Sequence, residues 1–223
     1  MSEIFITGDP HYGHDKNTRG LGGIIHHAHR INPTTLKPFE SIQEHDEYIL
    51  DSCNKVCSPK DTLIIAGDFA WRNHGHYIGA IKCKKILVTG SHDKMNVDCL
   101  RNFTAVYDGM FVTTIHDEAF VITHCAMAVW ERSHYGSTNL YAHSHGRIEE
   151  RDDIRSMDVG VDVSPNYTPF NIDFVIYKMS LKRKPNYSKS EEELSSIVRK
   201  NKDNNIVLAE QWKEFVQKKQ IKG

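Results

Sequence analysis

Aspartate and histidine residues follow five apolar runs of the sequence, and these residue types suit metal-dependent hydrolysis. The runs read "IFITGDPHYGH", "LIIAGDF", "ILVTGSHD", "AFVITHC" and "LYAHSHG". In the same order, the first run carries Asp9 and His11, the second Asp68, the third His92 and Asp93, the fourth His124, and the fifth His143 and His145. Carboxylates and imidazoles together suit zinc, manganese or iron, whereas an all-oxygen set suits calcium or magnesium. The number of ligands is sufficient for two metal ions.

The spacing of two of these residues would place their side chains on the same side of a strand. Alternate residues of a strand point to the same side, so the two histidines of the H-x-H motif, His143 and His145, can reach one metal cluster. A single D-x-H or H-x-H motif is commonly a turn or a pair of ring contacts. The prediction therefore depends on five strand ends that carry such residues together.

The elements that must position these residues are short and apolar. Five segments predict strands, several of them apolar enough to be buried on both faces: 3–7, 62–66, 85–89, 111–115 and 119–123. In open α/β sheets ligands bind at the carboxyl ends of the strands. We therefore expect one rim of a layered α/β domain to collect the aspartates and histidines.

One helix and one hairpin are predicted between these strands. Residues 39–56, "FESIQEHDEYILDSCNKV", predict a helix, because Ser41 and Glu44 form a capping box. Its expected apolar stripe is Ile42, Tyr48, Ile49 and Val56. The "HDE" between residues 111–115 and 119–123 predicts a hairpin turn.

The C-terminal part differs in charge from the rest. Residues 181–223 hold 11 Lys and Arg against 6 Asp and Glu, which leaves 17 against 23 for residues 1–180. The segment "KRKPNYSK" predicts a boundary, followed by two helices that begin near Ser190 and after Asn205. We expect a domain at 1–180 and a basic helical appendage at 181–223, which is commonly no more than a solvated face.

Composition restricts the class of protein further. The net charge of −1 excludes a binder driven to nucleic acid by charge alone. The five cysteines are odd in number and scattered, so neither a disulfide framework nor a zinc ribbon is predicted, and a reducing cytoplasm is the expected location. The first residues lack the basic and long apolar regions of a signal peptide, and no membrane partner is expected.

The ordered series D-x-H, G-D, G-(N)-H-D, H and (G)-H-x-H resembles the signature of the calcineurin-like metallophosphoesterases. The match runs from Asp9 to His145, and "GDPHYGH" and "DVGVD", which ends at Asp162, are similar to compact bacterial and phage members. The resemblance covers about residues 3–180. It implies a four-layer α/β/β/α sandwich of two mixed sheets with helices on the outer faces, and hydrolysis of a P–O bond.

The resemblance also implies a role for each residue. Two divalent metals, Mn²⁺ first and Zn²⁺, Fe²⁺ or Ni²⁺ as alternatives, would hold a bridging hydroxide for in-line attack. His92 would act as the general acid, and Asp93 would orient its ring. The metal ligands would be Asp9, His11 and His145 for the first metal, Asp68 as the bridge, and His124 and His143 for the second metal.

Two positions depart from the family pattern. Ser91 stands where an asparagine usually binds the second metal, and its shorter hydroxyl is a poorer ligand. Three interpretations stay open: a natural variant with a looser second metal, a site tuned to a different metal, or a substitution made to slow turnover. Ala142 stands where glycine usually precedes the H-x-H pair, and we expect the extra methyl group to be tolerated.

Several residues near the motifs are candidates for substrate binding. They are His14, Asn17, Arg72 and Arg147. The two arginines suit phosphate, although either could instead pair with the acidic run Glu149, Glu150, Asp152 and Asp153. Trp71 is expected to pack rather than to stack on a base. Nothing in the sequence places His26, His27 and His29 near the cluster, so they are interpreted as surface residues or loop contacts.

The sequence thus predicts a phosphomonoesterase or phosphodiesterase that acts on a small, nucleotide-type phosphoester. One alternative is a scaffold with weakened catalysis that binds a partner protein, for which Ser91 is the best argument. Another is a nuclease, which usually has a broad basic surface, whereas residues 1–180 are net acidic. The sequence does not define the oligomeric state.

Overall fold

The computed structural model describes residues 2–15, 29–182, 196 and 199–200. The chain divides into two compact units, Met1–Pro185 and Asn186–Gly223. The expected appendage at 181–223, with its helices near Ser190 and after Asn205, lies almost entirely outside the described residues and stays a prediction. None of the helices in the described part is long and apolar enough to cross a membrane.

The first sheet has five strands, of which four run parallel. Its order is β11-β1-β4-β5-β6, and β11 is antiparallel to β1. The strands are β1 (Ile4–Thr7), β4 (Thr62–Ala66), β5 (Lys84–Val88), β6 (Ala105–Tyr107) and β11 (Phe170–Asn171). The apolar runs predicted at 3–7, 62–66 and 85–89 are therefore confirmed as neighbouring central strands.

The second sheet is also mixed. Its order is β10-β9-β8-β7, with β7 antiparallel to β8 and the other pairs parallel. The strands are β7 (Met110–Ile115), β8 (Glu118–Thr123), β9 (Thr138–Tyr141) and β10 (Ser156–Asp158). His116 and Asp117 both have positive φ in the two-residue turn, which suits the twist of a hairpin and confirms the one predicted.

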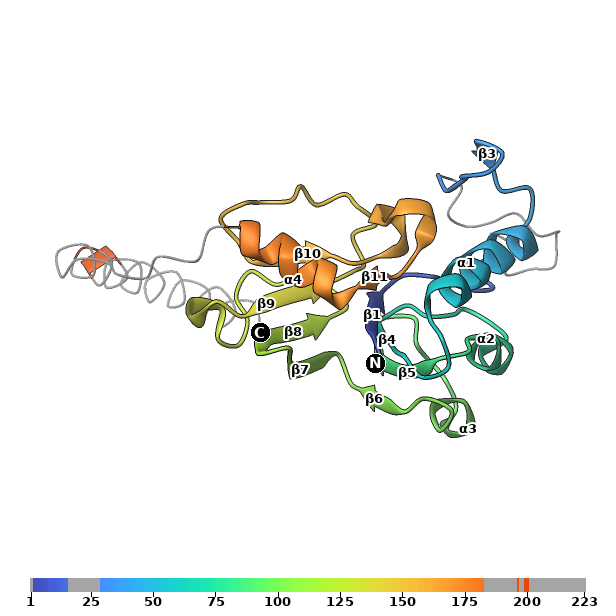
Figure 1. Cartoon of the computed structure of the whole chain (residues 1–223), viewed down its shortest axis with the longest axis horizontal. Helices are drawn as coiled ribbons and strands as arrows, with labels where there is room; N and C mark the ends of the chain where they lie inside the picture. The colour runs from blue at the N-terminus through green and yellow to red at the C-terminus, as the bar shows by residue number, and fades with distance from the viewer. Residues whose placement is uncertain (1, 16–28, 183–195, 197–198, 201–223) are drawn as a thin grey trace, which may run out of the picture. The chain divides into compact units, whose positions relative to one another are not determined.

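Helices and short elements complete this unit. The α-helices are α1 (Ile42–Val56), α2 (His74–Ala80), α3 (Val97–Leu100) and α4 (Ile172–Leu181). Three 3-10 helices are η1 (Ser133–Tyr135), η2 (Val161–Val163) and η3 (Pro165–Tyr167), and a small hairpin joins β2 (Ile31–Asn32) to β3 (Lys37–Pro38). Figure 1 shows α1, α2 and α3 on the side of the first sheet that faces away from the second sheet.

Helix α1 begins as predicted but buries a different face. Ser41 Oγ accepts from the Glu44 N–H at 3.1 Å, while the Glu44 carboxylate accepts from the Glu40 N–H rather than completing the capping box. The expected stripe is wrong at Val56, which is exposed, because the buried side of the helix includes the polar pair His45 and Asp46. This pair supports the functional site described below.

Two apolar clusters hold the layers together. One packs α1 and α2 against the first sheet, with Ile49, Leu63 and Leu87 among its buried members. The other fills the space between the two sheets, and α4 contributes Ile172, Val175 and Met179 to it. The architecture is thus the predicted α/β arrangement of two mixed sheets with helices, and the carboxyl ends of its strands are held on a rigid core.

Candidate metal centre

The five strand ends that carry aspartate or histidine converge in the structure. The parallel pairing aligns the ends of β1, β4 and β5, and the loops that follow are tied by bonds from Asp9 N to Gly67 O (3.0 Å) and from His11 N to Asp68 O (3.1 Å). Strands β8 and β9 bring His124 and His143 to the same place, where His143 N donates to Asp9 Oδ2 at 2.6 Å.

Asp68 lies at the centre of this cluster. Its Oδ2 is 3.6 Å from His11 Nε2 and 3.2 Å from His124 Nε2. On one side, Asp9, His11 and His145 each place a ligand atom within 4.8 Å of the others, and on the other side Asp9, Asp68 and His124 do the same. His143 Nδ1 lies 3.1 Å from His124 Nε2. These groups could hold metal ions on both sides of Asp68.

Glycines stand beside the expected ligands at positions where a larger residue would collide with them. A Cβ on Gly67 would lie 2.5 Å from the His124 ring, and a Cβ on Gly90 would collide with the Asp68 carboxylate. A Cβ on Gly8 would lie 2.5 Å from the Ala142 methyl group. Gly8 therefore provides the space that the extra methyl group of Ala142 occupies.

Five of the expected ligands have left-handed backbone conformations. The φ angles are 54° at Asp9, 53° at His11, 52° at Asp68, 63° at His143 and 50° at His145. Residues other than glycine adopt this region rarely, and such conformations concentrate at functional sites. The turns after the strands thus hold these side chains at an energetic cost.

The charges at the cluster indicate that a cation fits there. Asp9 is fully buried, and its Oδ1 makes no hydrogen bond. Burial raises the pKa of Asp9 to about 7. Burial lowers the pKa of His124, but its hydrogen bonds to Asp68 and Ala66 outweigh this effect and raise that pKa to about 9. A buried carboxylate oxygen without a donor is costly unless a proton or cation binds it.

His92 lies beside the cluster rather than within it. Its Nε2 is 3.8 Å from Asp68 Oδ2, and its side chain is 40% exposed. Its backbone N–H donates to Asp68 Oδ1 at 2.9 Å, which fixes the loop after β5 against the central carboxylate. Trp71 contacts the His92 ring, with ring centroids 4.8 Å apart.

Asp93 has a different role from the one expected. Its Oδ2 accepts from the N–H groups of Asp68 and Gly90, and its Oδ1 accepts from the N–H of Phe69, each at 2.8 Å. Both oxygens are thus used to join the end of β4 to the end of β5. The expectation that Asp93 orients the His92 ring is replaced by a role in holding the Asp68 backbone.

Ser91 reaches Asp68 only weakly. Its Oγ lies 3.4 and 3.5 Å from the two carboxylate oxygens, and the residue is exposed. These distances are at the limit for a hydrogen bond, since a good O–H···O bond is about 2.7 Å long. The position that the resemblance assigns to an amide ligand therefore holds a hydroxyl that is only loosely hydrogen-bonded to Asp68.

The structure distributes the four expected substrate residues differently. His14 is buried and stacks on Trp71, with ring centroids 4.3 Å apart, so Trp71 packs as predicted. Arg72 pairs with Asp15 at 3.8 Å rather than with the acidic run. Arg147 is exposed on the loop after His145. Asn17 lies outside the described residues, as do His26 and His27.

His29 is a half-exposed loop contact, as interpreted from the sequence, but it lies close to the cluster, which nothing in the sequence indicated. Its Nε2 is 3.0 Å from Asp162 Oδ1, and its ring centroid is 6.1 Å from that of His145. The other oxygen of Asp162 is 2.7 Å from His145 Nδ1. Contacts between positions so distant along the chain leave no local pattern, although the motif "DVGVD", which ends at Asp162 in η2, is one of those that carry the resemblance.

A buried arginine supports the same region and was missed by the sequence interpretation. Arg30 is 1% exposed, and its guanidinium donates to both Asp162 oxygens and to the carbonyls of Asp9 and Pro10. Burial opposes ionisation of Asp162, but His145 and Arg30 hold its pKa well below the usual range. This bidentate pair fixes the carboxylate that orients His145.

The polar pair of α1 extends this support. His45 lies between Arg30 Nη1 (2.9 Å) and Asp46 Oδ1 (2.8 Å), and burial lowers the pKa of His45. Asp46 Oδ2 accepts from the Gly13 N–H and from the Tyr77 hydroxyl. The loop after β1 is thereby anchored to the helix behind it.

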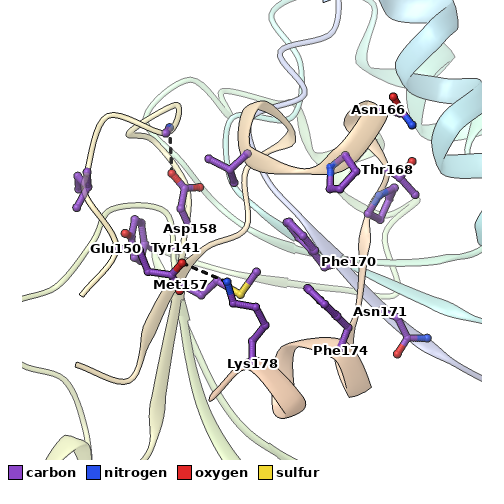
Figure 2. A pocket seen from close by; sticks show the side chains of 15 residues that line it. Tyr141, Glu150, Met157, Asp158, Asn166, Thr168, Phe170, Asn171, Phe174 and Lys178 are labelled. Carbon is purple, nitrogen blue, oxygen red and sulfur yellow. Dashed lines mark hydrogen bonds and ion pairs between the residues drawn. The ribbon is translucent and has the colours of Figure 1, made fainter. Parts of the chain in front are cut away.

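A largely apolar pocket of about 590 Å³ lies beside the loop that carries His145 (Figure 2). Gly146 and Asp158 line the side nearest that loop, and Phe170 and Phe174 supply two nearly parallel rings. Lys178 donates to Glu150 at its edge. Of the predicted substrate residues that the structure describes, His14, Arg72 and Arg147 do not line this pocket.

Comparison with known proteins supports the fold. The chain matches no family model and no curated protein. Among solved structures it is similar to the protein of unknown function AQ665 from Aquifex aeolicus, with a TM-score of 0.54 and 20% identity over 80% of this chain and 100% of that one. A second match is Yfce, a phosphoesterase from E. coli, with a TM-score of 0.34 and 11% identity over 71% of this chain and 78% of that one.

Proposed function

We propose that this chain is a metal-dependent phosphoesterase with a dinuclear metal centre. The observation that carries the proposal is the Asp68 carboxylate between the His11 and His124 nitrogens, beside the buried Asp9 oxygen that has no donor. Asp9, His11 and His145 would bind the first metal, and His124 and His143 the second. Asp68 would bind both.

The chemistry of the donor set fits two divalent cations, Mn²⁺ or alternatively Zn²⁺, Fe²⁺ or Ni²⁺. Such ions activate a water molecule as the nucleophile and neutralise the phosphoryl oxygens. His92 is the proton donor to the leaving oxygen, because it stands next to Asp68 and is open to solvent on one side. Asp162 lies 2.7 Å from His145 Nδ1, so Nε2 would be the nitrogen that binds the metal.

The proposed substrate is a small phosphomonoester or phosphodiester, with a nucleotide as the preferred class. Arg147 and Arg72 are proposed to bind phosphate oxygens from the loops after His145 and after β4. The pocket beside His145 is of a size that suits a small ligand, and its two phenylalanine rings suit a planar organic group. The net acidic charge of residues 1–180 argues against a long nucleic acid.

The first experiment measures hydrolysis of a nitrophenyl monoester and of the bis-nitrophenyl diester by chelator-stripped protein reloaded with Mn²⁺. We expect metal-dependent turnover, and the preferred ester distinguishes a phosphatase from a phosphodiesterase. Asp68→Asn is the matched control, because it keeps the shape of the bridging side chain but weakens both metal sites. Equal turnover by Asp68→Asn, or none by the parent with metal bound, would exclude this mechanism and favour a scaffold.

A further inference from the structure

The second metal site has one donor fewer than the first if Ser91 does not bind. Its hydroxyl, 3.4 to 3.5 Å from the Asp68 carboxylate oxygens, is a weaker donor than an amide oxygen, which leaves Asp68, His124 and His143 as the strong donors proposed on that side. A metal with only these three protein ligands keeps a position open for water, and it can expand to a fifth position that another donor fills.

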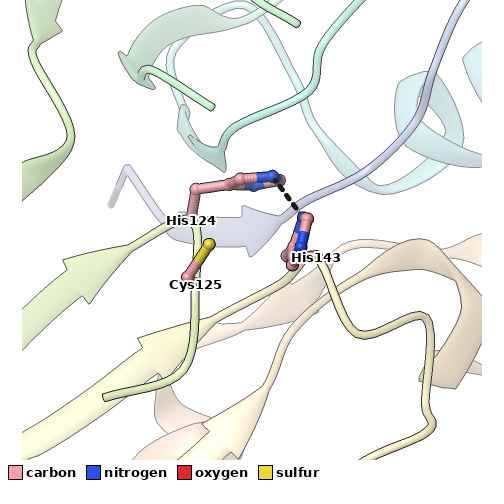
Figure 3. Close-up of side chains that lie close together, drawn as sticks. All are labelled: His124, Cys125 and His143. Carbon is pink, nitrogen blue, oxygen red and sulfur yellow. Dashed lines mark hydrogen bonds between the residues drawn. The ribbon is translucent and has the colours of Figure 1, made fainter. Parts of the chain in front are cut away.

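Cys125 stands next to this incomplete set. It follows His124 directly at the end of β8, and its sulfur lies within 4.8 Å of ligand atoms of both His124 and His143. Figure 3 shows the sulfur directed to the same side as the two rings. Cys125 is exposed, whereas Cys53, Cys57 and Cys83 are buried in the apolar cluster that packs α1 and α2 against the first sheet.

We propose that the Cys125 sulfur is a ligand of the second metal and takes the place that Ser91 leaves vacant. The site would then combine one carboxylate, two imidazoles and one thiolate, and would select zinc over manganese. This inference rests on the proposed dinuclear centre and specifies the chemistry of its second half. On binding, the Cys125 S–H bond breaks, its proton goes to solvent, and the sulfur electron pair forms the bond to the metal.

Two of the neighbouring ligands, His124 and His143, have a spacing that suits one zinc ion. His124 Nδ1 lies 3.0 Å from the Ala66 carbonyl, so that Nε2 is the nitrogen turned toward His143. The 3.1 Å between the two imidazole nitrogens is close to the roughly 3.4 Å that two nitrogens keep on a tetrahedral zinc. The Thr123 hydroxyl donates to the Cys125 carbonyl at 2.8 Å and fixes the backbone from which the sulfur projects.

The donor types decide the choice of metal. Thiolate is a soft ligand that favours zinc and iron, while manganese and magnesium prefer carboxylate, carbonyl and water oxygens. An asparagine at position 91 would offer a carbonyl oxygen to manganese. A serine at this position, together with the Cys125 thiol after β8, moves the preference toward zinc.

Cobalt provides a direct test of the sulfur ligand. Chelator-stripped protein is titrated with Co²⁺ under reducing conditions, and the near-ultraviolet band of sulfur-to-cobalt charge transfer is recorded. We expect two Co²⁺ per chain, with the band in the parent, and loss of the band in Cys125→Ser. Cys99→Ser is the matched control, because Cys99 lies in α3 away from the cluster, and it should keep the band.

Zinc affinity and thiol protection give independent measurements. Cys125→Ser should weaken Zn²⁺ at one of the two sites by at least the ~10–100-fold that loss of a supporting partner costs. Zn²⁺ should also slow alkylation of Cys125, mapped by mass spectrometry, while leaving the rate at Cys99 unchanged. Two Co²⁺ bound without the band, and equal alkylation with and without Zn²⁺, would overturn the role of Cys125 but not the dinuclear centre. No bound metal would overturn both.

Discussion

At the scale of single residues, the cluster assigns different tasks to side chains of the same type. Asp9 and Asp68 face the histidines, whereas Asp93 and Asp162 hold the backbone and a ring in place. Burial raises the pKa of Asp9, while the partners of Asp162 keep its pKa well below the usual range. The surroundings of each carboxylate, rather than its type, therefore decide whether it is suited to bind a metal or to orient a ligand.

The position of His92 leads to a prediction on leaving groups. His92→Ala removes the proposed proton donor, so turnover should fall by about 10²–10⁴-fold for an alkyl ester. The loss should be much smaller for a nitrophenyl ester, whose leaving oxygen needs no proton. The comparison of kcat for the two esters measures this difference. Equal losses for both esters would assign His92 a role other than proton donation.

The position of Ser91 leads to a prediction on metal affinity. Ser91→Asn supplies an amide oxygen where the hydroxyl now lies 3.4 Å from Asp68, and should tighten Mn²⁺ at one site by about tenfold or more. Titration of the stripped protein with Mn²⁺ measures the change. Ser144→Asn, on the loop between His143 and His145, is a control for added bulk near the site. An unchanged titration would mean that residue 91 does not limit Mn²⁺ binding.

At the scale of secondary-structure elements, the site is built from the ends of β1, β4, β5, β8 and β9. Apolar runs predict these strands well, because burial on both faces leaves a plain pattern in the sequence. The contacts that support the expected ligands leave no such pattern in the sequence. Arg30 and Asp162 are 132 positions apart, and Asp93 accepts from backbone groups of a neighbouring loop. Such contacts depend on how strands are ordered in the sheet, which residue types alone do not encode.

The tie between β4 and β5 leads to a prediction on stability. Asp93→Ala leaves three backbone N–H groups without their acceptor and should lower the free energy of unfolding by about 2–5 kcal/mol. Urea unfolding of the metal-free protein measures this loss. Asp98→Ala removes an exposed carboxylate and should change stability by less than about 1 kcal/mol. If Asp93 served only to orient His92, the two variants would be equally stable.

At the scale of the whole molecule, protons and metals compete for the same buried groups. Burial raises the pKa of Asp9 from 3.8 to about 7. For His124, burial lowers the pKa, but its hydrogen bonds to Asp68 and Ala66 outweigh this effect and raise the pKa from 6.5 to about 9. A raised pKa means that the folded state binds its proton more tightly than the unfolded state does. The stability that these protons provide is complete at a pH below the pKa values of the unfolded state. It is lost as the pH rises through the pKa values of the folded state.

This competition leads to a prediction on pH. Between pH 6 and 8.5 the metal-free protein should lose stability, while the increase in Tm caused by a fixed concentration of Mn²⁺ should grow, since fewer protons must be displaced. Thermal unfolding with and without Mn²⁺ at several pH values measures both trends. A metal-induced increase in Tm that is the same at pH 6 and 8.5 would show that neither group binds the metal.

The left-handed turns have a consequence for how this site persists under selection. At about 1 kcal/mol for each of five residues, they consume roughly 5 kcal/mol of the 5–15 kcal/mol that holds a typical domain together. Glycine at any of these positions would relieve the strain and remove a ligand at once. Selection for thermal stability alone would therefore replace residues of the cluster first. In a library screened only for heat resistance, we expect glycine at positions 9, 11, 68, 143 and 145 before substitutions in the core.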